Sequence, residues 1–97
     1  MRSLYKRVEV EEPVVFSLEY FIFCEEENSY GLEIVKKING QCLEAKAAKS
    51  LSDSREEIEE LAERLSCGQV TPVTLGYIVE DMLYERFYRR VAASIAG

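Results

Sequence analysis

The sequence predicts an α+β domain in which a four-stranded antiparallel meander precedes two helices packed on one sheet face, in the order ββββαα. Three observations predict it: period-two alternation in the first half, an Asn39-Gly40 pair between two alternating runs, and helical spacing of apolar residues in the second half. The chain has 97 residues and lacks a linker rich in Pro, Gly or Ser. We therefore expect residues 1–97 to form a single domain.

The strand expected inside this sheet runs from Val14 to Cys24. Its odd positions hold both polar and apolar residues. Because side chains alternate between the two faces of a sheet, Phe21 and Phe23 are expected on the face opposite the even positions. Before it, Leu4 to Glu11 alternates well enough for another strand, which Glu12-Pro13 would close because proline lacks an N–H donor. The even positions of the inner strand form an uninterrupted apolar series: Val14, Phe16, Leu18, Tyr20, Ile22 and Cys24.

Asn39-Gly40 predicts a two-residue type I′ turn, because both residues tolerate positive φ. Ile38 then sits opposite Gln41 and Lys37 opposite Cys42. In this register the hairpin has one apolar and one charged face. The alanines on its apolar face leave room for a helix. The further expected pairs are Leu32 with Ala47, Ile34 with Ala45, Glu33 with Lys46, and Val35 with Glu44.

Two helices follow. Ser54 with Glu57, or Asp53 with Glu56, fits an N-cap followed three residues later by a glutamate. Gly68 is expected to end this first helix, and Thr71-Pro72 to begin the second, which would reach Ile95. The apolar face of the first helix consists of Ile58, Leu61, Ala62 and Leu65.

The second helix carries two apolar stripes, whereas a surface helix of a small domain needs only one. The first stripe suits the core: Leu75, Ile78, Val79, Met82 and Leu83. The other lies on roughly the opposite face and begins at Tyr77. Its later members follow the spacing of a helix–helix seam: Tyr84, Tyr88, Val91 and Ile95.

We expect these four residues to form an interface, joined by Phe21 and Phe23 on the second face of the sheet. A helix from Pro72 to Ile95 would be about 36 Å long, which is long for so small a sheet. Two alternatives remain open at this point. The stripe packs on the N-terminal strand, or the last turns of the helix fray.

Composition excludes several classes of function. The net charge is −6, with a sequence pI near 4.7, which disfavours nucleic acid and anionic membranes as partners. Histidine is absent, which removes the usual near-neutral base and the commonest transition-metal ligand. The three cysteines are widely spaced and do not predict a disulfide framework. With no targeting or membrane-spanning segment visible, a cytoplasmic protein is expected.

No catalytic, cofactor-binding or metal-binding residues are predicted. Glu80 and Asp81 point about 100° apart on a helix, and neighbouring arginines neutralise Asp81 and Glu85. The run from Tyr84 to Arg90 interleaves aromatics with arginines, as some nucleic-acid-binding segments do. The rest of the acidic chain argues against that use.

Three short motifs resemble a small uncharacterised family of clostridial-type bacterial proteins, known as a domain of unknown function. They are Tyr30-Gly31-Leu32-Glu33, Ser50-Leu51-Ser52, and the segment from Val70-Thr71-Pro72 to Met82-Leu83. In that family a histidine often precedes the leucine of the second helix, where this chain has Thr74. The resemblance covers the chain from Tyr30 onwards and implies a soluble bacterial protein with no assigned chemistry.

The sequence thus favours a non-enzymatic protein that acts through protein–protein contact and self-associates through its C-terminal helix as a homodimer. The alternative is a small-ligand-binding regulatory module with a pocket between the helices and the sheet. An enzyme using carboxylate chemistry around Asp81 and Glu85 would need a metal, and ranks third.

Overall fold

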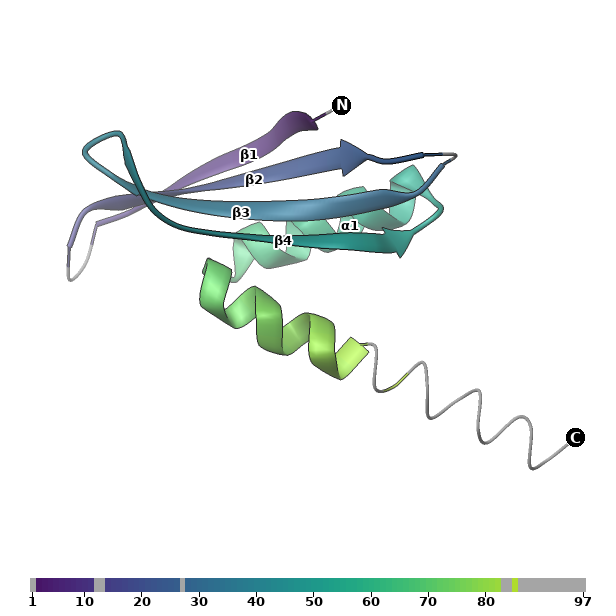
Figure 1. The fold of residues 1–97 in the computed structure, drawn as a ribbon. Helices are drawn as coiled ribbons and strands as arrows, with labels where there is room; N and C mark the ends of the chain where they lie inside the picture. The colour runs from purple at the N-terminus through teal and green to yellow at the C-terminus, as the bar shows by residue number, and fades with distance from the viewer. Residues whose placement is uncertain (1, 12–13, 27, 83–84, 86–97) are drawn as a thin grey trace, which may run out of the picture.

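The computed structural model describes residues 2–11, 14–26, 28–82 and 85. They form one antiparallel sheet with strand order β1-β2-β3-β4, followed by two helices, which confirms the predicted ββββαα fold (Figure 1). The second helix is described over residues 72–82 and at Glu85. The labelled elements are β1 (Arg2–Val10), β2 (Phe16–Cys24), β3 (Tyr30–Ile38), β4 (Gln41–Ser52) and α1 (Arg55–Cys67).

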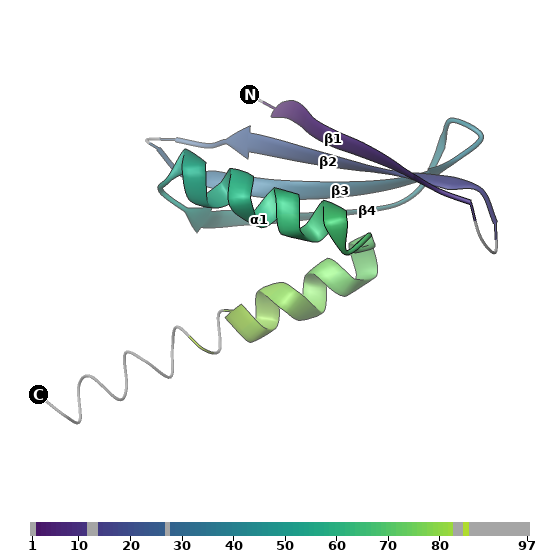
Figure 2. The ribbon, with the colours of Figure 1, turned by 180° about the vertical axis from the view of Figure 1, so that it is seen from behind.

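Both helices lie on the same face of the sheet, and α1 contacts all four strands (Figure 2). The second helix turns back from the end of α1 and diverges from it. Within the described residues, no helix covers the other face of the sheet, which we call the second face (Figure 1). None of the described helices combines the length and apolar character needed to cross a membrane.

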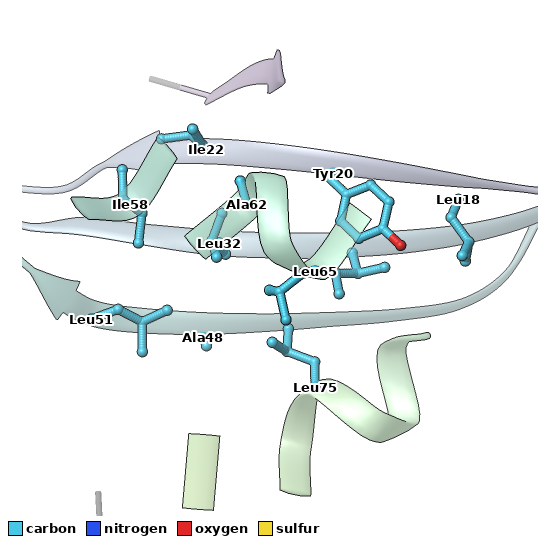
Figure 3. Packing of buried hydrophobic residues seen from close by; sticks show 11 residues of the cluster. Leu18, Tyr20, Ile22, Leu32, Ala48, Leu51, Ile58, Ala62, Leu65 and Leu75 are labelled. Atoms are coloured by element: carbon cyan, nitrogen blue, oxygen red, sulfur yellow. The ribbon is translucent and has the colours of Figure 1, made fainter. Parts of the chain in front are cut away.

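The core lies between the sheet and the helices (Figure 3). The even positions of β2 supply Leu18, Tyr20 and Ile22, all of them at most 1% exposed, as the alternation predicted. The Tyr20 hydroxyl donates to the Val70 carbonyl at 2.9 Å, and burial raises the pKa of this phenol to about 12. The rest of the cluster comes from β3, β4 and the helices: Leu32, Ile34, Ala48, Leu51, Ile58, Ala62, Leu65 and Leu75.

Two strand boundaries differ from the expectation. β1 starts at Arg2 and ends at Val10, whereas Leu4 to Glu11 was expected, because pairing with β2 extends to Arg2 opposite Phe23. β2 begins at Phe16, and Val14 lies outside it and is 55% exposed. The apolar series at even positions therefore reaches the core only from Phe16 onwards.

The β3–β4 hairpin has the predicted turn, with φ of 52° at Asn39 and 78° at Gly40. Ile38 pairs with Gln41 and Lys37 with Cys42, as expected. Beyond them the predicted register is wrong, because Leu43 is an extra residue in a β-bulge. The observed pairs are Lys36 with Glu44, Val35 with Ala45, Ile34 with Lys46, Glu33 with Ala47, and Leu32 with Ala48.

A second irregularity lies near the end of β4. Tyr30 pairs with Ser52 and Leu32 with Ala48, so residues 49–51 lie opposite the single residue Gly31. Ser50 has a φ of 54°, and its N–H and Oγ both donate to Glu25 Oε2, at 3.1 and 3.2 Å. As a result Ala48 and Leu51 are both buried although they are three residues apart.

Candidate interaction surface

The predicted interface on the second helix can be examined in the first turns of that helix. Leu75 is 1% exposed and belongs to the core, whereas Tyr77 is 65% exposed. Val73, four residues before Tyr77 and therefore on the same face, is 57% exposed. The stripe thus starts on a face turned away from the core. Val73 was not among the residues predicted for the stripe, although its spacing from Tyr77 indicates the same face.

The remaining helix residues assigned to the interface lie outside the described residues: Tyr84, Tyr88, Val91 and Ile95. The expected core residue Leu83 is outside them as well. Glu85, between Tyr84 and Tyr88 in the chain, is helical and exposed. The helical backbone of Glu85 is consistent with the predicted continuation beyond Met82.

The other two predicted interface residues, Phe21 and Phe23, lie on the second face and are half-buried. The Arg2 guanidinium stacks over the Phe21 ring, 3.7 Å from its centroid, and Arg2 Nε also pairs with Glu33 Oε1 at 2.8 Å. The Phe23 ring lies against Gly31 on the neighbouring strand. Contacts within the sheet therefore cover part of each ring.

A groove of about 230 Å³ lies between α1, the end of β4 and the second helix. Its apolar wall consists of Leu51 and Ile58, which are buried, and Leu61 and Met82, which are half-buried. Its polar lining consists of Ser52, Glu57, Glu60 and Arg64. The groove is where a pocket between helices and sheet was expected, and it is open to solvent.

The ends of the helices set the shape of this groove. The Ser54 side chain accepts a hydrogen bond from the Glu57 N–H at 3.3 Å and caps α1, so the first of the two predicted caps is correct. At the other end, Gly68 is the C-cap with a φ of −83°. The left-handed residue is the next one, Gln69, with a φ of 52°.

This C-terminal arrangement is a Schellman motif. The Val70 N–H donates to the Leu65 carbonyl at 3.0 Å, and the Gln69 N–H donates to the Ser66 carbonyl at 3.1 Å. The chain then enters the second helix, where the Leu75 N–H donates to the Thr71 carbonyl at 3.0 Å. Pro72 is the first helical residue, as predicted. This short connection reverses the chain and brings Met82 next to α1 and β4.

The polar groups along the groove have partners on their own element or close to it. Arg64 Nη2 donates to Glu60 Oε1 at 2.7 Å, and the Ser52 hydroxyl donates to Glu57 Oε2. The Glu60–Arg64 side chains are 64% and 75% exposed. Exposed ion pairs of this kind contribute no more than about 1 kcal/mol to the free energy of unfolding, so these side chains can change partners at little cost.

A separate polar cluster joins α1 to β1. Tyr5, the unpaired residue at the β1 register shift, and Lys6, which follows it, both donate to Glu63, at 2.8 Å and 3.3 Å. The Tyr5 hydrogen bond, followed by that of Lys6, lowers the pKa of Glu63, and the bond to Glu63 raises the pKa of Tyr5. The Cys67 thiol donates to the same carboxylate at 3.5 Å. This cluster orients α1 on the sheet.

The carboxylates of the second helix that were considered as metal ligands, Glu80, Asp81 and Glu85, are exposed. Across the part of the chain that the structure describes, no group of three or more His, Cys, Asp or Glu side chains is placed to hold a metal ion.

A family model matches residues 3–85, which include β1 from Ser3 onwards, the other three strands, α1 and the described part of the second helix. The chain belongs to DUF6514, a family of unknown function. The DUF6514 match begins well before Tyr30, so the likeness to a domain of unknown function extends over more of the chain than the three sequence motifs. Comparison with curated proteins and with solved structures found no match.

Proposed function

We propose that this protein works without catalysis, through protein–protein contact, and that it self-associates as a homodimer through its C-terminal helix. The observation that supports the proposal is the exposure of Tyr77 and Val73, at 65% and 57%. Both lie on the face that continues in sequence to Tyr84, Tyr88, Val91 and Ile95. A contiguous apolar stripe turned away from its own core is typical of an interface.

Phe21 and Phe23 are proposed as a second part of the interface. They are half-buried on the second face, which no described helix covers. Aromatic side chains are enriched among residues that dominate binding energy. Because contacts to Arg2 and Gly31 already cover part of both rings, we assign the larger share of the binding free energy to the C-terminal stripe.

The first test is the absolute mass in solution, measured by light scattering over a concentration series. We expect a dimer for the wild type and a monomer for the double variant Tyr88→Glu with Val91→Glu, with an unchanged circular dichroism spectrum. The reason is that two buried carboxylates per chain would cost several kcal/mol in an apolar interface.

The matched control is Val14→Glu with Leu43→Glu, which adds the same charge at apolar positions that are 55% and 56% exposed. This control should remain a dimer. Loss of the fold in the Tyr88 and Val91 variant would mean that these residues belong to the core, and a monomeric wild type would refute self-association.

A small-ligand-binding regulatory role is the second candidate, because the groove of about 230 Å³ lies between the helices and the sheet. Ligand pockets usually measure about 300–1,000 Å³ and enclose most of the ligand, so we place protein contact first. A thermal-shift screen with saturable stabilisation by one compound class would favour the ligand.

The proposal includes a cytoplasmic location in a bacterium of clostridial type. It is supported by the resemblance of the three sequence motifs and by Cys42 and Cys67, which are exposed thiols as expected in a reducing compartment. Fractionation of cells that express the protein would test the location.

A further inference from the structure

The proposed function does not say which surface receives the C-terminal stripe. We propose that residues 84–95 of one copy occupy the groove between α1 and the second helix of another copy, and that the exchange is reciprocal. This inference rests on the proposed self-association and adds the receiving surface to it. Four observations support it: the apolar wall of the groove, its acidic rim, the basic charge of the segment, and the direction of the chain.

The groove offers an apolar surface of suitable size. Leu61 and Met82 are half-buried along it, above the buried Leu51 and Ile58. A cavity of roughly 150 Å³ is known to hold a benzene ring, so the groove volume of about 230 Å³ accommodates the ring of Tyr84 or Tyr88. The partly exposed walls would then be covered by the stripe.

The charges of the two surfaces are complementary. α1 contains five glutamates and two arginines. Glu57, Glu60 and Arg64 line the groove, so its lining carries one net negative charge. Residues 86–90 read RFYRR, with three arginines and no acidic residue. The present partners of Glu57 and Glu60 are the half-buried Ser52 hydroxyl and the exposed Arg64 guanidinium. Arginines of an incoming segment can replace the exposed Glu60–Arg64 pair at little cost. Charge complementarity of this kind favours one register and one partner.

The direction of the second helix favours a second copy over the same chain. Met82 already lines the groove, and Glu85 is still helical. The second helix diverges from α1 towards this end (Figure 2). To enter its own groove, the chain would have to reverse after Glu85 within a few residues. A segment from a second copy requires no such reversal.

A charge-exchange experiment tests this arrangement. The groove variant is Glu57→Arg with Glu60→Arg, and the segment variant is Arg86→Glu with Arg89→Glu. Each variant alone places like charges in both halves of the reciprocal interface, so we expect the dimer Kd to rise at least about 100-fold. In a heterodimer of the two variants, the groove and the segment that meet in each half of the interface carry opposite charges. We therefore expect an equimolar mixture to form this heterodimer with a Kd within about tenfold of the wild type, measured by light scattering and sedimentation.

The matched control is Glu56→Arg with Glu59→Arg, which has the same spacing on α1 and the same charge change but lies outside the groove lining. It should dimerise like the wild type. If circular dichroism shows that the groove variant does not fold, Glu57→Gln with Glu60→Gln replaces it, since glutamine retains the N-terminal capping geometry. A rise in dimer Kd of about tenfold is then expected.

The outcomes separate this inference from the proposed function. A monomeric wild type refutes the self-association itself. A dimeric wild type whose segment variant is monomeric while the groove variant stays dimeric keeps the proposed function and refutes the groove as the receiving surface. Two monomeric variants whose mixture also stays monomeric refute the reciprocal exchange.

Discussion

Gly31 lies where the backbone of β4 and a phenyl ring approach β3 closely. A Cβ atom at this position would lie 2.5 Å from Phe23 Cζ and closer still to the Ala48 carbonyl oxygen. The ring of Phe23 therefore covers the space that a side chain of residue 31 would take. This contact packs the second face of the sheet, which no described helix covers. It requires a glycine at position 31.

We expect Gly31→Ala to lower the free energy of unfolding by about 1–3 kcal/mol, because the β4 backbone or the Phe23 ring must move. Urea unfolding followed by circular dichroism measures the change. The control is Gly68→Ala, whose Cβ would meet its nearest atom at an ordinary 3.5 Å. It should leave the free energy of unfolding unchanged or raise it by up to about 1 kcal/mol. Equal losses in both variants would contradict a local steric cause.

At the scale of elements, α1 is attached to β1 through Glu63. Its carboxylate accepts hydrogen bonds from Tyr5 on one oxygen and from Lys6 on the other. A register shift between Leu4 and Lys6 in β1 accompanies this contact, because Tyr5 has no partner in the ladder with β2. An irregular position in an edge strand thus helps to dock the helix.

The lowered pKa of Glu63, caused first by Tyr5 and then by Lys6, makes this attachment pH-dependent. Because the folded pKa lies below the unfolded one, the contribution is present above the unfolded pKa of about 4.3 and is lost as the pH falls through the folded pKa. We expect the gap in urea midpoint between the wild type and Glu63→Gln to narrow from pH 6 to pH 3.

The variant Tyr5→Phe is the control for this pH dependence, since it removes the largest cause of the shift. In a Tyr5→Phe background the effect of Glu63→Gln should vary less with pH. The wild type should also lose stability above pH 10, because the pKa of Tyr5 is raised and the contribution of such a group disappears as the pH rises through it. A gap that stays constant at acid pH would contradict the role given to Glu63.

At the scale of the whole molecule, each strand pairs with its neighbour in the chain. Such a meander closes short loops first, and only the docking of the helices joins distant segments. We expect refolding in one exponential phase, between milliseconds and about one second, at protein concentrations where the chain is monomeric. Stopped-flow circular dichroism tests this, and a curved folding limb together with missing amplitude would contradict it.

Much of this architecture follows from local sequence signals. Alternation at even positions placed Leu18, Tyr20 and Ile22 in the core, and Asn39-Gly40 predicted the turn. The register beyond the turn was not predictable, because an inserted residue such as Leu43 changes the pairing without disturbing the alternation of its neighbours.

For the candidate surface, the sequence placed Phe21 and Phe23 on the second face and Tyr77 opposite Leu75, and both placements are observed. The groove was expected only in general terms. Its shape depends on the angle between two helices, which the connection through Gln69 sets. A glutamine at a left-handed position gives no signal that a local pattern can detect, since glycine is the usual residue there.

The irregular course of β4 also bears on how the molecule behaves when concentrated. This strand lies at the edge of the sheet, where unpaired backbone groups can recruit another strand and begin fibril growth. Leu43 and residues 49–51 interrupt its ladder, so the regular run between them covers only residues 44–48 and carries Lys46. A short, charged run is a poor template for cross-β stacking. Association of this chain should therefore yield discrete particles that redissolve on dilution, without amyloid fibrils.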